Sequence, residues 1–161
     1  MVERKFLNMK NNTIQISVVC PVFNSESYII ETLRSVTSQS YPAFEILVID
    51  DGSKDNTVSK VKRFSEQFSI PIKIITGQHK GPGAARNKGI YAAKSKWIAF
   101  IDSDDLWEEN KLEVVTRAMA RNKSKNIFCN SEYHQDKYGA KILADYGKNY
   151  DLIAPLSQQL Y

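Results

Sequence analysis

The stretch that decides the fold is residues 97–107, which read WIAFIDSDDLW. Its first five residues are apolar and have the length and composition of a central parallel strand that is covered on both faces. Carboxylates follow directly at Asp102, Asp104 and Asp105. Ligands of open α/β sheets bind outside the carboxyl ends of the strands, so these acids lie where a functional cluster is expected. Carboxylates this close repel one another, and a bound divalent metal would relieve that repulsion.

Three further apolar runs precede this stretch and alternate with amphipathic segments. We expect Ser25 or Ser27 to cap the first helix, Asp55 the second, and Asp105 a helix that follows the acids and ends near Arg121. The pattern predicts an α/β fold, with a Rossmann-like, mostly parallel sheet flanked by helices. The expected strands are residues 14–20, 44–49, 70–76 and 97–101, and the expected helices before the acids are about residues 27–39, 56–68 and 84–93.

The ends of the chain carry weaker signals. We expect residues 1–13 to form a tail and residues 14–161 to form one domain, because 161 residues with 42% hydrophobic content can bury a core. Residues 126–133 and 138–143 could pair as strands around a turn near Lys137.

Composition argues against several classes of protein. The net charge of +4 comes from 22 basic and 18 acidic residues spread along the chain, without the dense basic block of a nucleic-acid-binding protein. Cys20 and Cys129 are too few for a disulfide framework or a cysteine zinc site, and we expect both to be buried. The start of the chain lacks the apolar segment of a signal peptide, and no stretch reaches transmembrane length. We therefore expect a cytoplasmic protein.

Unusual chemistry follows each of the four expected strands, in residues 21–26, 50–53, 77–86 and 102–104. The carboxyl ends of parallel strands meet at one edge of a sheet, so these loops should converge. Their convergence is the main argument for a functional site, because each motif alone is weak.

Each loop motif also has an ordinary structural interpretation. Asp50 and Asp51 with the following Gly-Ser form a common turn, although a carboxylate there could accept hydrogen bonds from a nucleobase or ribose. The glycines of residues 81–83 could be a simple connector, or could bring backbone N–H groups and a helix N-terminus near a phosphate. His79 is more often a loop histidine than a catalyst, because no nucleophile is paired with it. Arg86 suits a solvated surface, a phosphate or the nearby acids equally well.

The acids of residues 102–105 divide by expected role. If Asp105 caps the next helix, Asp102 and Asp104 have no structural task left. Alternating acids can direct two oxygens at one hard cation, and Mg²⁺ or Mn²⁺ typically takes one or two protein carboxylates while substrate phosphates complete the shell. Such a metal would neutralise charge on a departing diphosphate.

Three ordered motifs carry a resemblance to a known family. They are SVVCPVFNSESYIIETLRSVTSQSYPAFEILVIDDGSKDNT at residues 17–57, GPGAARNKGI at residues 81–90 and WIAFIDSDDLWEENKLE at residues 97–113. Over about residues 14–120 the chain resembles the N-terminal nucleotide-binding half of family 2 glycosyltransferases with the GT-A fold. The resemblance implies an inverting transfer from a nucleotide sugar, usually a UDP-sugar, to an acceptor hydroxyl, with Mn²⁺ or Mg²⁺ as cofactor.

The resemblance also implies roles for particular residues and partners. The acceptor would be a saccharide or a lipid-linked sugar of a cell-surface polysaccharide or glycolipid pathway, which makes peripheral association with the inner face of the membrane an alternative location. Pro21, Phe23 and Glu26 would border the nucleoside, Asp51 would contact the base, Arg86 would lie near the nucleotide, Asp102 would approach the ribose, and Asp104 would hold the metal.

No general base can be assigned from the sequence. The family's catalytic base and acceptor-binding elements come later than the matched region, and Glu132, Asp136, Asp145 and Asp151 have no motif around them. We therefore expect a domain truncated at its C-terminal end, and the alternative function is a non-catalytic nucleotide-sugar-binding fragment. A phosphoacceptor domain is disfavoured because the first strand ends in Cys-Pro rather than in acids. A nucleotidyltransferase is disfavoured because the loop after that strand lacks a glycine-rich phosphate clamp.

Overall fold

The computed structural model describes residues 13–121, 133–135 and 141–143. The chain divides into two compact units, Met1–Glu113 and Val114–Tyr161. The predicted tail, residues 1–13, lies almost wholly outside the described residues, as do Cys129 and the carboxylates Glu132, Asp136, Asp145 and Asp151. Within the described part of the chain, no helix is both long and apolar enough to cross a membrane.

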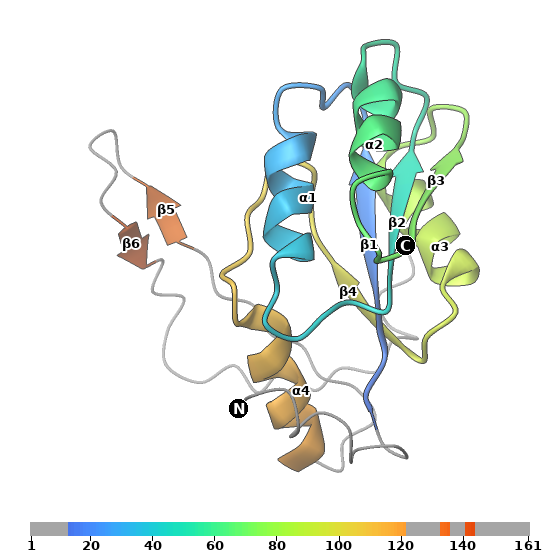
Figure 1. Cartoon of the computed structure of the whole chain (residues 1–161). Coiled ribbons are helices and arrows are strands. Elements are labelled where there is room, and N and C mark those ends of the chain that lie inside the picture. The colour runs from blue at the N-terminus through green and yellow to red at the C-terminus, as the bar shows by residue number, and fades with distance from the viewer. Residues whose placement is uncertain (1–12, 122–132, 136–140, 144–161) are drawn as a thin grey trace. The chain divides into compact units, whose positions relative to one another are not determined.

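A four-stranded parallel sheet forms the centre of the first unit (Figure 1). The strand order is β3-β2-β1-β4, and β1 is paired so that Val19 lies opposite Leu47 on one side and Phe100 on the other. This sheet confirms the predicted α/β fold. The strands are β1 (Ile16–Val22), β2 (Glu45–Asp50), β3 (Ile72–Thr76) and β4 (Trp97–Phe100).

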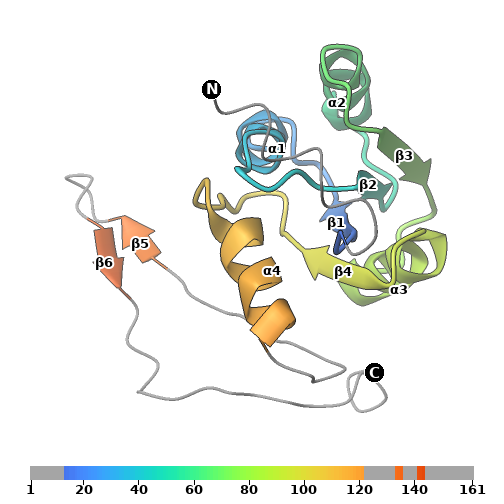
Figure 2. The ribbon, with the colours of Figure 1, turned by 60° about the horizontal axis from the view of Figure 1, so that its bottom comes forward.

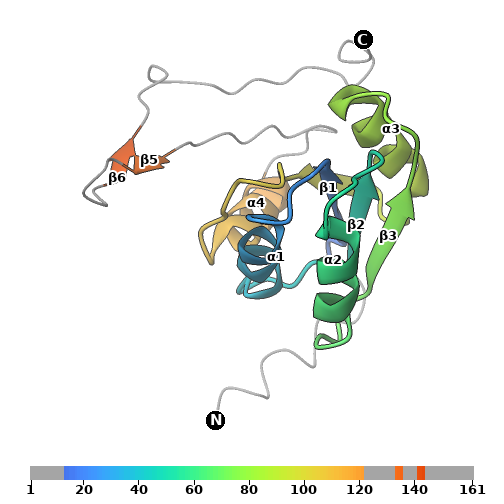
Figure 3. The same ribbon diagram turned by 90° about the horizontal axis from the view of Figure 1, so that it is seen from above.

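Helices cover both faces of the sheet. The helices α1 (Ile29–Thr37) and α2 (Thr57–Ser65) lie on one face, and α3 (Pro82–Ala92) lies on the other (Figures 2 and 3). The chain moves outward from β1 to β3 and then returns through α3 to β4 on the far side of β1. The carboxyl ends of β1 and β4 therefore form the point at which the strand order reverses, which is where open α/β sheets bind ligands.

Burial differs between the strands in a way that the sequence did not indicate. Every residue of β1 and β2 is buried, as expected for strands that helices cover on both faces. The prediction that residues 97–101 form the central strand is wrong for the described sheet, because β4 lies at its edge and Phe100 is 39% exposed. An apolar run of strand length does not distinguish a central strand from an edge strand whose side chains are only half covered.

The small residues of α3 allow this helix to approach the sheet closely. A Cβ atom at Gly89 would lie 2.3 Å from Val19 Cγ1 and 3.2 Å from Ile49 Cγ1, so only glycine fits there. Ala85 is buried in the same apolar cluster together with Val19, Leu47 and Ile49.

The described helix α4 (Lys111–Arg121) crosses the boundary between the two units. The second unit also contains β5 (Tyr133–Gln135) and β6 (Lys141–Leu143), which pair in antiparallel fashion. Two strands thus pair in this region, but β5 shares only Tyr133 with the predicted residues 126–133, whereas β6 lies within the predicted residues 138–143. The turn near Lys137 lies outside the described residues.

The predicted helix caps were wrong. Helix α1 begins after Tyr28, and no side chain caps it, because a turn that starts at the Ser25 carbonyl precedes the helix. Helix α2 begins at Thr57, so Asn56, and not Asp55, occupies its N-cap position. The Asp55 carboxylate nevertheless accepts the Thr57 N–H at 2.9 Å, so it serves the same helix from outside the cap position.

Candidate functional site

The loops after β1 and β2 are joined by hydrogen bonds. The Asn24 N–H donates to Ser53 Oγ at 2.9 Å, and the Lys54 N–H donates to Asn24 Oδ1 at 2.9 Å. Asn24 has a φ of 50°, in the left-handed region that asparagine tolerates better than most residues. The two loops therefore form one continuous rim at the carboxyl edge of the sheet.

Glu26 connects the loop after β1 to the start of α2. Its carboxylate accepts the Asn56 N–H at 2.9 Å, and its own N–H donates to Asp55 Oδ2 at 3.0 Å. Burial opposes ionisation of Asp55, but the hydroxyl and N–H of Thr57 and the N–H of Glu26 together hold its pKa below the usual value. The Glu26 carboxylate thus has a structural partner in addition to the nucleoside-bordering role that we expect.

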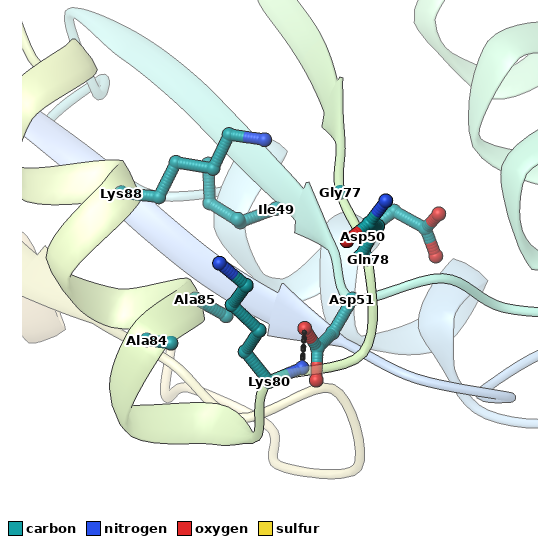
Figure 4. A pocket seen from close by; sticks show the side chains of 9 residues that line it. All are labelled: Ile49, Asp50, Asp51, Gly77, Gln78, Lys80, Ala84, Ala85 and Lys88. Carbon is teal, nitrogen blue, oxygen red and sulfur yellow. Dashed lines mark hydrogen bonds between the residues drawn. The ribbon is translucent and has the colours of Figure 1, made fainter.

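Asp51 accepts three hydrogen bonds at the carboxyl end of β2. The Lys80 N–H donates to Oδ1 at 2.9 Å, the Gly81 N–H donates to Oδ2 at 2.8 Å, and His79 Nδ1 lies 2.9 Å from Oδ2. Figure 4 shows the Asp51 carboxylate against the Lys80 N–H. The Lys80 and Gly81 N–H groups and the nearby His79 lower the pKa of Asp51, so it is ionised at neutral pH.

The neighbouring Asp50 has a different role from Asp51. Its carboxylate is buried and accepts the Ser53 N–H at 3.0 Å, which fits the ordinary turn interpretation, and its carbonyl accepts the Gly77 N–H at 2.8 Å. Gly52 between Asp51 and Ser53 has a φ of 87°, which favours glycine. The turn interpretation therefore holds for Asp50, while the Asp51 carboxylate faces the loop after β3.

Aromatic rings meet above Asp51. The rings of Phe23 and His79 are stacked, with 4.1 Å between their centroids and 27° between their planes. Phe23 is 42% exposed, whereas Pro21 lies buried within β1 opposite Ile49. Of these two predicted nucleoside-bordering residues, Phe23 is the one that presents an accessible surface.

A pocket of about 350 Å³ opens beside Asp51, between the ends of β2 and β3 and the first turns of α3 (Figure 4). This volume lies within the usual range for small-molecule sites. The pocket combines acids from β2 with two lysines, and its lining residues are Ile49, Asp50, Asp51, Gly77, Gln78, Lys80, Ala84, Ala85 and Lys88.

Of the acids that follow β4, Asp102 pairs with Arg86. Arg86 Nη2 donates to Asp102 Oδ1 at 2.5 Å. Of the interpretations left open for Arg86, the pairing with a nearby acid is therefore the one that the structure contains. Asp104 is exposed, and its carboxylate makes no hydrogen bond or ion pair with any residue that the structure describes. It is therefore available to a ligand from solvent.

Asp105 does not cap the following helix, contrary to the sequence prediction. Helix α4 begins at Lys111, and the Asp105 N–H instead donates to the Asp102 carbonyl at 3.1 Å, within a turn. Asp102 and Asp104 are therefore not set apart from Asp105 by a helix cap. Asp102 pairs with Arg86, whereas Asp104 is exposed.

The buried thiol of Cys20 lies close to this turn. Burial raises the pKa of the Cys20 thiol, and the carboxylates of Asp102, Asp104 and Asp105 raise it further. Cys20 is fully buried and free, which confirms the prediction of a buried core cysteine. It is a neutral core residue and not a nucleophile.

Hydroxyl groups tie the turn of acids to the loop after β1. Ser25 Oγ and Ser103 Oγ lie 2.7 Å apart, and Thr32 Oγ1 donates to the Ser103 carbonyl at 2.8 Å. Ser25 and Thr32 are both buried. These hydrogen bonds of Ser103 therefore link the loop after β4 to the loop after β1 and to α1, at the point where the strand order reverses.

Polar side chains of α1 continue this attachment along the segment that follows the acids. The Trp107 N–H donates to Ser35 Oγ at 3.1 Å. Gln39 Nε2 donates to the Glu108 carbonyl at 2.7 Å, and Gln39 Oε1 accepts the Leu112 N–H at 2.9 Å. We call Thr32 and Ser35 of α1, together with Gln39 two residues beyond its end, the polar stripe of α1. The stripe holds the segment between Ser103 and Leu112 in a defined non-helical path.

The site thus brings together most of the residues that the sequence indicated. Asp51 and Phe23 meet at His79, and Arg86 meets Asp102, all at one edge of the sheet. Sequence reasoning considered Ser25 only as a helix cap, and it missed the contact of Ser25 with Ser103 and the polar stripe. The stripe could have been found, since its residues recur at intervals of three and four, the spacing of one helix face.

Comparison with known proteins identifies the family. Residues 17–157 match the family model described as glycosyl transferase family 2. The chain belongs to glycosyl transferase family 2. It is 41% identical over 124 residues to an uncharacterized glycosyltransferase of Rickettsia conorii, covering 77% of this chain and 20% of that protein. It is 40% identical over 118 residues to the Escherichia coli enzyme WfgD, named as a UDP-Glc:alpha-D-GlcNAc-diphosphoundecaprenol beta-1,3-glucosyltransferase, covering 73% of this chain and 46% of that enzyme.

Solved structures of this family share the fold. The crystal structure of Staphylococcus aureus TarS 1-349 in complex with UDP superposes with a TM-score of 0.63 and 32% sequence identity, covering 68% of this chain and 33% of TarS 1-349. The family 2 chain therefore has the GT-A fold. It spans less than half the length of each of these relatives.

Proposed function

We propose that the chain binds the donor of a glycosyltransferase that moves a sugar from a nucleotide diphosphate, a UDP-sugar, to an acceptor hydroxyl with inversion. In this reaction the acceptor oxygen bonds to the anomeric carbon while the bond from that carbon to the diphosphate oxygen breaks, and a carboxylate base takes the hydroxyl proton. One observation carries the proposal: Asp51, Arg86, Asp102 and Asp104 converge at the edge where the strand order reverses.

The chemistry of these residues suits a nucleotide. Asp51 is an ionised acceptor for an N–H of the base, and the partly exposed ring of Phe23 offers a stacking surface beside it. Arg86 orients the Asp102 carboxylate, which can accept hydrogen bonds from ribose hydroxyls, and its guanidinium supplies positive charge near the diphosphate. Pro21 and Glu26 complete the predicted nucleoside side of the site.

A divalent cation fits beside Asp104. The carboxylate is exposed and has oxygen ligands of the kind that Mg²⁺ and Mn²⁺ prefer, and Asp102 lies two residues away. The described residues contain no group of three potential ligands, which suits a metal that substrate phosphates help to hold. When bound, the metal would neutralise charge on the departing diphosphate.

The relatives support the class of substrate. WfgD is named for a UDP-glucose donor and a lipid-diphosphate-linked acceptor, and TarS was solved with UDP. By analogy we propose a saccharide or lipid-linked acceptor in cell-surface polysaccharide synthesis. We place the protein in the cytoplasm at the inner face of the membrane, where a soluble donor and a lipid-linked acceptor can meet.

Calorimetric titration of UDP with and without Mn²⁺ tests the donor site. We expect Mn²⁺ to tighten UDP binding to the wild-type chain and Asp104→Ala to abolish this gain, because the variant removes the exposed carboxylate. Asp105→Ala is the matched control, since it removes the adjacent exposed acid and should keep the gain. If Asp104→Ala retained the full effect of Mn²⁺, the metal assignment would be wrong.

Turnover is a separate question from binding. Release of UDP from UDP-sugars by the purified 161-residue chain, with and without a lipid-linked saccharide, measures transfer and donor hydrolysis. Turnover would reject the alternative of a non-catalytic nucleotide-sugar-binding fragment. Tight UDP binding without any turnover would favour that alternative.

A further inference from the structure

The imidazole of His79 makes the two contacts that a nucleobase would need at this site. Its ring stacks on Phe23 with 4.1 Å between centroids, and its Nδ1 atom lies 2.9 Å from Asp51 Oδ2. One partner is an aromatic face and the other is an acceptor at the edge of the ring. A flat heteroaromatic ring that carries an N–H at its edge satisfies both at once.

Asp51 and Phe23 can together accommodate one such ring. An ionised carboxylate has about four lone-pair positions, and Asp51 already uses two for the Lys80 and Gly81 N–H groups. Asp51 is only 6% exposed, so a further donor must approach from the side where His79 now lies. Uracil offers a planar ring and an N–H group, as His79 does.

We propose that His79 occupies the nucleobase position in the free protein and must swing away for the donor to bind. This inference rests on the proposed function, in which Asp51 and Phe23 receive the base. It makes His79 a residue that tunes donor affinity through competition with the base. His79 need not touch the sugar or the diphosphate.

The loop can release the ring without changing its backbone. The Lys80 and Gly81 N–H groups bond to Asp51 through the backbone alone, and neither bond involves the imidazole. The loop also rests on Gly52, where an added Cβ would lie 3.2 Å from the Gly77 carbonyl oxygen and 3.4 Å from the His79 nitrogen. The side chain of His79 is 60% exposed, so a rotation of that side chain into solvent is sufficient.

Competition of this kind has a measurable cost in affinity. When only a fraction of the molecules has an open site, the apparent dissociation constant rises by the inverse of that fraction. Removing the ring should therefore tighten binding of every ligand that carries the base. It should leave ligands without a base unaffected.

Titrations of UDP, uridine and inorganic pyrophosphate into the wild type and His79→Ala test the proposal. We expect UDP and uridine to bind about three- to tenfold more tightly to His79→Ala, as expected for losing one stacked aromatic pair, with pyrophosphate unchanged. Tyr91→Ala is the control, because it removes an aromatic ring that is 86% exposed on α3. Weaker UDP binding to His79→Ala would show that the ring supports the base, and equal binding would show that it is irrelevant; either result overturns the proposal.

Nuclear magnetic resonance supplies an independent readout. The chain has two histidines, so the His79 resonance is identified by its loss in His79→Ala. We expect its ring protons to be shifted upfield by Phe23 in the free protein and to move towards unstacked values as uridine saturates the site. A resonance that stays upfield at saturation contradicts the inference alone. Failure of UDP to bind either the wild type or His79→Ala contradicts the proposed function as well.

Discussion

Glu45 shows how a single buried carboxylate is accommodated at the amino end of the sheet, opposite the candidate site. It is 1% exposed and accepts hydrogen bonds from Ser17 Oγ at 2.9 Å, Lys73 Nζ at 3.0 Å and the Lys94 N–H at 2.7 Å. Burial opposes ionisation, but the Lys94 N–H and the side chains of Lys73 and Ser17 together lower the pKa of Glu45. The three donors join β1, β3 and the turn before β4 through one side chain of β2.

We predict that Glu45→Gln lowers the free energy of unfolding by about 1–3 kcal/mol at neutral pH, because an amide cannot accept all three bonds. The folded-state pKa of Glu45 lies below its ordinary value of 4.5, so its contribution is fully present above that pH and is lost as the pH falls through the folded-state value. Urea unfolding of wild type and variant across this range should show the difference shrinking in acid. A difference that stays constant at all pH values would contradict the assignment.

Individual residues were predictable where their chemistry does not depend on distant partners. The acids after the second and fourth strands could be assigned to the sheet edge from the alternation of elements alone. The pairing of Arg86 with Asp102 was one of several open interpretations, because the two come from different elements. The cap assigned to Asp105 was wrong because the following residues bond to Ser35 and Gln39 instead of starting a helix.

At the scale of elements, α1 acts as a support for the turn of acids as well as a cover for the sheet. Its apolar face packs inward through Ile29, Leu33 and Val36. Its polar stripe meets the backbone of the segment that runs from Ser103 to Leu112. Helix α1 thus packs into the core and also holds the turn that carries the candidate metal ligand Asp104.

We predict that Gln39→Leu destabilises the chain by about 1–3 kcal/mol, since the Leu112 N–H loses its side-chain acceptor and the Glu108 carbonyl keeps only the Lys111 N–H of its two donors. It should also weaken UDP binding in the presence of Mn²⁺ more than in its absence, because the acid turn loses its support. Thermal unfolding and paired titrations measure the two effects. Ser38→Ala, which changes the exposed residue at the C-cap of the same helix, should leave both unchanged. A loss of stability with an unaltered Mn²⁺ effect would make Gln39 structural only.

The helices and strands themselves followed from the sequence to within a few residues. Apolar runs predicted all four strands of the sheet, apolar periodicity predicted the first two helices, and a run of small residues predicted the third. These patterns did not predict which strand lies at the edge or where the helices begin, since both depend on contacts between elements that are far apart in sequence.

For the whole molecule, the proposed nucleotide-binding residues all fall within the unit Met1–Glu113. We predict that UDP with Mn²⁺ stabilises this unit, by about 2.7 kcal/mol at a ligand concentration of 100 times the dissociation constant. Hydrogen exchange should show slower exchange in the loops after β1, β2 and β3. Equal protection across residues 114–121 would indicate that the second unit also takes part in binding.

The contact between Ser25 and Ser103 has a consequence for how the protein folds. The two residues are 78 positions apart in the chain, and Thr32 and Ser103 are 71 apart. Contacts of such long sequence separation form slowly, because the intervening chain must be ordered first. During synthesis, β1 to β3 and their two helices can assemble while the acids are still absent. The turn of acids after β4 is then the last part of the sheet edge to be completed, and a ribosome-bound intermediate that lacks β4 should show no gain in UDP affinity when Mn²⁺ is added.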